Sequence, residues 1–119
     1  MGKSVIAVPI LVAVSLVIMS KAASAASLTG NDLLPACRDF INKQFSKDPL
    51  SQAPCIGMID ALAFAAPDSQ ISRACVPDNV AVTQATTVVV RWLEKRPQDW
   101  HKPFSVLVLF ALHDTWPCP

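Results

Sequence analysis

The sequence predicts an all-α protein: a small domain of four to five helices, tied by two disulfides and preceded by a cleavable signal peptide. Apolar residues recur at helical spacing in segments that prolines separate. No pair of segments shows the strict alternation expected of a half-buried sheet. All four cysteines follow an apolar N-terminal stretch. These features are typical of a small exported protein that needs cross-links to hold its core.

The first residues are typical of an export signal. Lys3 supplies the positive start, residues 4–20 form an apolar core, and Ala23 and Ala25 make a small-x-small cleavage site. We therefore predict a signal peptide over residues 1–25. The apolar core has about fifteen residues, whereas a helix that spans a membrane needs about 20. Lys21, just before the predicted cut, leaves a retained membrane anchor as the alternative.

The mature domain, predicted over residues 26–119, carries Cys37, Cys55, Cys75 and Cys118. An even count in a short exported chain indicates disulfides, and the absence of a C-x-x-C pair argues against a zinc or redox motif. Four cysteines allow three pairings. We favour Cys55–Cys75 with Cys37–Cys118, which would pin a long connection to the second helix and join the two ends of the domain.

The net charge argues against nucleic-acid binding. The whole chain has a formal charge of +1, and the predicted signal peptide removes two lysines and no acid, which leaves the mature domain at −1. A nucleic-acid-binding domain needs a clustered basic face. After signal removal we also expect no membrane association.

The first predicted helix covers residues 32–45, where every fourth residue is apolar, and Asn31 or Asp32 is expected to cap it. The second is expected to begin at a Ser51 cap and to end at Pro67. Its small residues predict that another helix packs closely against it: Ala53, Gly57, Ala61 and Ala65.

Residues 68–81 lack a sustained period and are predicted to be a long connection. A third helix is expected to start at a Thr83 cap and to run to Pro97. The valines at 88–90 alone would favour a strand, but the apolar face around them has helical spacing. A fourth helix follows Pro103, and because it is apolar all round we expect it at the centre of the domain.

Candidate catalytic and metal-binding groups are few. A cysteine nucleophile is excluded because oxidised cysteines are not thiolates. His101, His113 and Asp114 have no recognised metal-ligand spacing, and we expect His113 to interact with the C-terminal end of its helix.

Asp60 lies in an apolar stretch, so it is expected either to face solvent or to pair with Arg38 or Arg91. There is no G-x-S-x-G motif, and three scattered glycines cannot form a phosphate loop. We therefore predict that the protein is not an enzyme and has no cofactor and no metal.

The segment 94–104 is the strongest candidate site, because it gathers an acid, an imidazole, an indole and several cations between two prolines. Asp99 and His101 could serve as acid and base, but no nucleophile is evident nearby. Trp and Arg dominate binding hot spots, so we predict a partner contact rather than a catalytic site, with an ordinary solvated turn as the alternative. The predicted contact residues are Arg96, Gln98, Asp99, Trp100, His101 and Lys102.

Five stretches of the mature chain resemble, in order, the motifs of one family. They are GNDLL at 30–34 followed by a cysteine, CIGMIDA at 55–61, CVP at 75–77 with VT at 82–83, VVRWL at 89–93, and the closing 107–118 with its LV, AL and WPC. This pattern is similar to that of the Rap/Tai immunity proteins, periplasmic inhibitors of the peptidoglycan amidase toxins that type VI secretion delivers.

The resemblance implies an all-helical, often dimeric periplasmic protein that occludes an amidase with rigid loops and without catalysis. The implied partners are a cell-wall amidase toxin and a second copy of the chain. One alternative is a periplasmic acid-stress chaperone of the HdeA type, since CRDF at 37–40 faintly resembles that family, although the family has a single disulfide. Another is a binding module whose partner is unknown. A secreted lipid carrier is disfavoured because the paired cysteine motifs of such carriers are absent.

Overall fold

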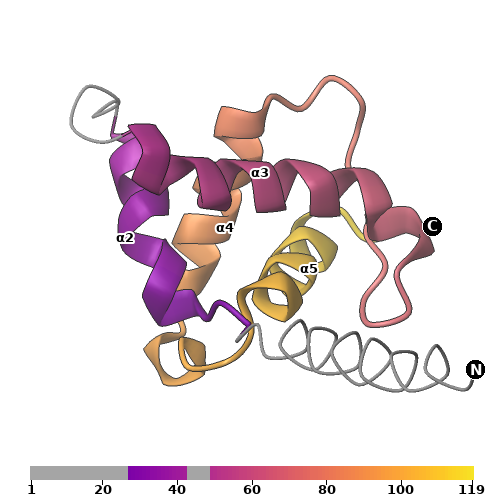
Figure 1. Cartoon of the computed structure of the whole chain (residues 1–119). Coiled ribbons are helices and arrows are strands. Elements are labelled where there is room, and N and C mark those ends of the chain that lie inside the picture. Colours follow the sequence, from indigo (N-terminus) through magenta and orange to yellow (C-terminus); the bar gives the residue numbers. More distant parts are fainter. Residues whose placement is uncertain (1–26, 43–48) are drawn as a thin grey trace, which may run out of the picture.

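The computed structural model describes residues 27–42 and 49–119, and in these residues the protein is all-α. Figure 1 shows α3 lying across the other helices, with α5 near the centre. The predicted signal peptide falls outside the described residues. The helices are α2 Gly30–Ile41, α3 Pro49–Ala65, α4 Val82–Glu94 and α5 Phe104–Thr115, with short 3₁₀ turns η1 Ala66–Asp68 and η2 Pro97–Asp99.

The centre of the core is α5, as its uniformly apolar sequence predicts. Only Phe110 among its apolar residues is exposed, at 40 %. Six of its side chains are buried: Phe104, Leu107, Val108, Leu109, Ala111 and Leu112. The valine run at 88–90 is helical, which confirms the preference for helix over strand, because Val89, Val90 and Leu93 form one face buried against the core.

The start of α2 differs from the prediction. Thr29 is the N-cap, whereas Asn31 and Asp32 were expected, and Asp32 instead closes a capping box three residues later. The Thr29 N–H donates to the Asp32 carboxylate at 2.8 Å, and this bond, with that of the Thr29 hydroxyl, lowers the pKa of Asp32 below 3.8. The resulting stabilisation is present above pH 3.8 and is lost as pH falls through the lowered pKa.

The starts of α3 and α4 also differ. The predicted Ser51 cap lies inside α3, which already begins at Pro49, a residue whose fixed φ suits the first helical position. The predicted Thr83 cap lies inside α4, because Ala81 is the N-cap and makes no side-chain cap bond. The first helix was expected to reach residue 45, but 43–48 lie outside the described residues, and α2 is described to Ile41.

The predicted cysteine pairing is wrong. The structure joins Cys37 to Cys55, with Cα atoms 5.6 Å apart, and Cys75 to Cys118, at 4.9 Å. The first bond follows from the packing of α2 against α3, which places two buried cysteines face to face. The second follows from the course of the chain, because the Cys75 N–H donates to the Trp116 carbonyl at 2.8 Å. Each disulfide therefore holds a different part of the fold.

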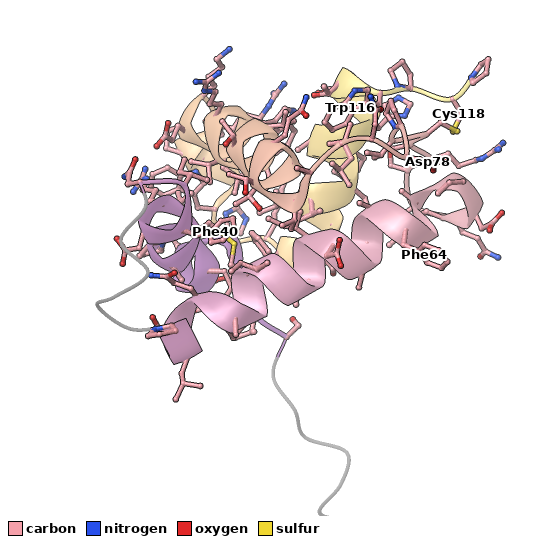
Figure 2. The ribbon with its side chains drawn as sticks, turned by 90° about the horizontal axis from the view of Figure 1, so that it is seen from above. Phe40, Phe64, Asp78, Trp116 and Cys118 are labelled. Carbon is pink, nitrogen blue, oxygen red and sulfur yellow. A yellow bond between two sulfur atoms is a disulfide. The ribbon has the colours of Figure 1, made fainter. Side chains whose placement is uncertain are left out.

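The connection after η1 is held at several points. Arg73 Nε donates to the Pro67 carbonyl at 2.8 Å, and the Ala74 N–H donates to the Ala66 carbonyl at 3.2 Å. Nδ1 of His113 lies 2.6 Å from the Arg73 carbonyl oxygen, so the end of α5 contacts this connection directly. Figure 2 shows Trp116 and Cys118 beside Asp78 in the same region. The connection is pinned through Cys75 as predicted, but Cys75 is joined to Cys118 near the C-terminus and not to the second helix.

The outer face of α3 contradicts one expectation. The small residues Ala53, Gly57, Ala61 and Ala65 are all exposed, so no described helix of the chain packs against them. The helix buries Cys55 and Ile59 on its other side. In the described part of the chain, no helix is long and apolar enough to cross a membrane.

Replacing Gly30 with alanine is expected to destabilise the fold. A Cβ at Gly30 would lie 2.9 Å from both the Trp100 carbonyl oxygen and Leu107 Cδ1. We expect the free energy of unfolding in urea to fall by about 1–3 kcal/mol, the usual cost of overpacking.

Gly57→Ala is the matched control, because a Cβ there meets no atom within 4 Å. In a monomeric sample it should raise stability by up to about 1 kcal/mol through helix propensity. Equal destabilisation by both substitutions would contradict the close packing at Gly30.

Candidate functional site: the α4–α5 turn

The segment between α4 and α5 is tied to the start of α2. The Asn31 N–H donates to the Trp100 carbonyl at 2.8 Å, and the Gly30 N–H donates to the Lys102 carbonyl at 3.2 Å. The Phe104 N–H in turn donates to the Leu28 carbonyl at 2.8 Å. Figure 1 shows this turn, in orange, beside the N-terminal end of α2. We call residues 95–103 the α4–α5 turn, and its backbone is held by contacts distant in sequence.

Trp100 packs inward. Its ring is half-buried against the core, and Nε1 donates to the Leu93 carbonyl at 2.7 Å, which satisfies an acceptor at the end of α4. Arg38 lies with Cζ 5.5 Å from the ring centroid. The missing side chain of Gly30 allows the backbone of α2 to approach Trp100. Trp100 therefore joins α2, α4 and the turn.

The other predicted contact residues differ in exposure. Gln98, His101 and Lys102 are exposed, whereas Arg96 and Asp99 are half-buried. The structure brings all six predicted residues into one turn, but it places three of them at the surface and three against their neighbours.

The Asp99 carboxylate already has a partner. Lys102 Nζ lies 2.9 Å from Oδ1, and this hydrogen bond, with the charges of Lys102, Arg96 and His101, lowers the pKa of Asp99 below 3.8. Asp99 therefore stays ionised near neutral pH, and its stabilising pair is lost only as pH falls through that lowered value. A carboxylate in this state is a weak proton acceptor, which does not suit a general base working near neutral pH.

The remaining candidate residues do not converge on a metal site. His101 lies in the turn and His113 near the end of α5, where it contacts the connection after η1. Within the described residues, no group of three histidine, cysteine, aspartate or glutamate side chains could hold a metal ion. Asp60 is exposed, so the solvent-facing alternative for it is confirmed.

Sequence reasoning missed a cluster next to the turn. Trp92 Nε1 donates to Asp114 Oδ2 at 2.7 Å, and Arg96 Nη2 lies 3.6 Å from the same oxygen. The Arg96 guanidinium stacks on Trp92, with Cζ 4.4 Å from the ring centroid. Trp92 lies on α4, Arg96 in the α4–α5 turn and Asp114 on α5, so no local spacing in the sequence could bring Asp114 to the other two.

The exposed end of α3 was also missed. Phe64 is 91 % exposed and Leu50, at the opposite end of the same helix, 85 %. Figure 2 shows Phe64 near the C-terminal end of α3, far from Phe40. An apolar residue in an apolar helix is expected to be buried, so sequence alone could not identify these two as surface residues.

The described residues form a small helical domain that two disulfides cross-link and whose α4–α5 turn is fixed to α2 by backbone hydrogen bonds. The family model of the Rap1a immunity proteins matches residues 29–118, nearly all of the predicted mature domain. The chain therefore belongs to the Rap1a immunity protein family. Proteins of this class bind a cognate toxin and are generally not catalysts. No curated protein and no solved structure matches the chain.

Substitutions at Trp100 are expected to reduce stability. Trp100→Ala should lower the free energy of unfolding by about 2–3 kcal/mol, somewhat less than the loss of a fully buried aromatic side chain. Trp100→Phe keeps most of the ring and loses the bond to Leu93, at a cost of about 1 kcal/mol.

His101→Ala is the matched control, with an expected change within about 0.5 kcal/mol because the side chain is exposed. Urea unfolding followed by circular dichroism measures all three. Wild-type stability for Trp100→Ala would show that the turn does not depend on the inward-packed ring.

Proposed function

We propose that this chain is a periplasmic immunity protein that binds a peptidoglycan amidase toxin and occludes its active site without catalysis. Membership of the Rap1a immunity proteins is the observation that carries the proposal. The predicted signal peptide and the two disulfides agree with export to an oxidising compartment. The family match favours this role over the acid-stress chaperone considered as the alternative.

The α4–α5 turn is our proposed toxin contact. Its backbone carbonyls accept hydrogen bonds from Gly30 and Asn31 of α2. Phe104, directly after the turn, donates to the Leu28 carbonyl just before α2, so little conformational freedom remains to be lost on binding. Gln98, His101 and Lys102 extend from this ordered backbone into solvent. They offer an amide, an imidazole and an ammonium group, which can hydrogen-bond to polar atoms in the cleft of an enzyme.

The inward-packed residues would support this contact. Trp100 positions the backbone through Leu93 and Gly30, and Asp99 orients Lys102. A change at Trp100 would therefore alter binding through the shape of the turn as well as through any direct contact. The exposed residues are the better targets for a binding test.

The toxin-contact proposal is tested with the purified chain and the cell-wall amidase encoded beside its gene. We expect stoichiometric inhibition of amidase activity on purified peptidoglycan. The triple variant Gln98→Ala, His101→Ala, Lys102→Ala should bind at least about tenfold more weakly, the size expected of a central contact region.

A variant with Gln70→Ala, Asp78→Ala and Gln84→Ala is the control, since it removes three exposed polar side chains outside the turn. If the wild type does not inhibit the amidase, the proposed target is wrong. If the wild type inhibits and the turn variant inhibits equally well, the contact lies elsewhere.

We also propose that two copies of the chain associate through the outer faces of α3. Gly57 lies in mid-helix, where glycine is unfavourable by about 1 kcal/mol relative to alanine, yet a Cβ there would meet no atom within 4 Å. The packing within a single chain therefore does not require glycine at position 57. A helix of a second copy packed closely against α3 would require it, because a side chain there would keep the two helices apart.

The spacing on this face is symmetrical about Gly57. Leu50 and Phe64 lie at equal distances along the sequence from Gly57, as do Ala53 and Ala61. An antiparallel pair of α3 helices on a two-fold axis at Gly57 would bring Leu50 against Phe64 of the partner subunit. This would bury two large side chains that are 85 % and 91 % exposed in the single chain.

The α3 association is tested by sedimentation equilibrium over a concentration series. The wild type should approach the mass of a dimer, and Gly57→Arg should remain monomeric with unchanged helical circular dichroism. Gln84→Arg, which adds the same charge at an exposed position of α4, should associate as the wild type does. A wild type that is monomeric throughout, or a Gly57→Arg dimer, would refute this interface.

A further inference from the structure

A hollow of about 290 Å³ lies between the last turns of α4 and the end of α5. We call it the cationic hollow, and it is lined by Val88, Arg91, Trp92, Lys95, Arg96 and Thr115. Three of these six residues carry a positive charge, and one is a tryptophan. Lys95 and Arg96 belong to the α4–α5 turn, whereas the other four lining residues do not, so the hollow extends beyond the proposed toxin contact.

The positive charge in the hollow is only partly balanced. The ion pairs of the described residues join Arg38 to Glu94, Arg96 to Asp114 and Lys102 to Asp99. Arg91 and Lys95 are exposed and take part in none of these pairs. The negative end of the α4 dipole stabilises the positive charges of Arg91 and Lys95 nearby. This interaction does not neutralise the two side chains, so a negatively charged ligand can still pair with them.

Arg96 is held in position with its hydrogen-bonding capacity largely unused. Its guanidinium stacks on Trp92, and its nearest acid is Asp114, with Nη2 and Oδ2 3.6 Å apart. Its Nε is buried without a hydrogen-bond partner. Trp92 in turn is fixed by its 2.7 Å bond to Asp114. A guanidinium fixed in this way loses little further freedom when it binds a carboxylate.

The size and charge of the hollow indicate what it can accept. Its volume is at the lower end of the range of about 300–1,000 Å³ for small-molecule sites, so one or two side chains of a protein suit it better than a whole ligand. A carboxylate matches the guanidinium fork of Arg96 and the charges of Arg91 and Lys95. Nucleic acid would need a more extended basic face than these three cations form in a domain of net charge −1.

We propose that the cationic hollow is a docking site for an acidic segment of a protein partner. One carboxylate of the segment accepts hydrogen bonds from Arg96, a second lies between Arg91 and Lys95, and the aliphatic part of the segment packs on Trp92 and Val88. This contact is additional to the α4–α5 turn. It can be tested without the toxin, so its failure would leave the proposed function standing.

The test uses the ¹⁵N-labelled chain purified from the periplasm and a short synthetic peptide of alternating glutamate and alanine. The indole N–H signal of Trp92, assigned with Trp92→Phe, should shift in a saturable way, and the shift should weaken as salt is added. A glutamine–alanine peptide of the same length should leave the signal unchanged.

Two charge variants separate a specific site from a general effect of net charge. Arg91→Gln with Lys95→Gln should lower peptide affinity at least about fivefold, as expected for the loss of two exposed ion pairs. Thr83→Glu with Gln84→Glu changes the net charge by the same amount at exposed positions of the same helix, outside the hollow. The affinity of this control variant for the peptide should differ from that of the wild type by less than about twofold.

Four outcomes would overturn the proposal. They are an unshifted Trp92 signal, an equal loss of affinity in the two charge variants, the same shift with sodium acetate alone, and equal binding of a single-stranded oligonucleotide. The third would mean a site for adventitious anions, and the fourth a general polyanion surface. Saturable binding of the peptide that the hollow variant weakens and the control retains would establish the site.

Discussion

Burial of α5 is the interaction on which the remaining structure depends. Six apolar side chains of this one helix lie in the core, and each fully buried large aliphatic or aromatic one stabilises the fold by about 1.5–3 kcal/mol. Because α5 occupies the centre, α3 and α4 pack around it (Figure 1). The turn before α5 and the segment after it therefore lie at the two ends of the bundle. The Cys75–Cys118 disulfide and several long-range hydrogen bonds lie at those two ends.

The two ends of α5 are held by different chemistry. Before α5, the α4–α5 turn is held by backbone hydrogen bonds to α2 and by the inward-packed Trp100. At its C-terminal end, α5 is held by the contact of His113 with the Arg73 carbonyl, and the segment after it by the Cys75–Cys118 disulfide. The α4–α5 turn and the segment after α5 are thus ordered by hydrogen bonds and a disulfide rather than by additional apolar burial. A loop that is already ordered in the free protein loses less conformational entropy when it binds a partner.

The type and separation of the helices depend on neighbouring residues and could be predicted from the sequence, although the caps of α2, α3 and α4 were misplaced. Features that depend on distant contacts could not be predicted. The prolines at 97 and 103 separate two helices as expected, and the period of apolar residues outweighs the β-branched run at 88–90. The cysteine pairing failed because it depends on how α2 meets α3. The inward orientation of Trp100 and the link from Trp92 to Asp114 likewise need two elements to be in place first. The small residues of α3 were expected to pack against another helix, yet the chain leaves that face exposed.

Hydrogen–deuterium exchange of the chain, alone and with the amidase that we propose as its partner, tests the central proposal: the α4–α5 turn is ordered before binding and then contacts the enzyme. In the free chain, the amides of Gly30, Asn31 and Phe104 should exchange slowly, because each donates to a distant carbonyl. In the complex, residues 97–102 should gain protection. Fast exchange at those three amides in the free chain, or protection confined to another surface, would contradict the claim.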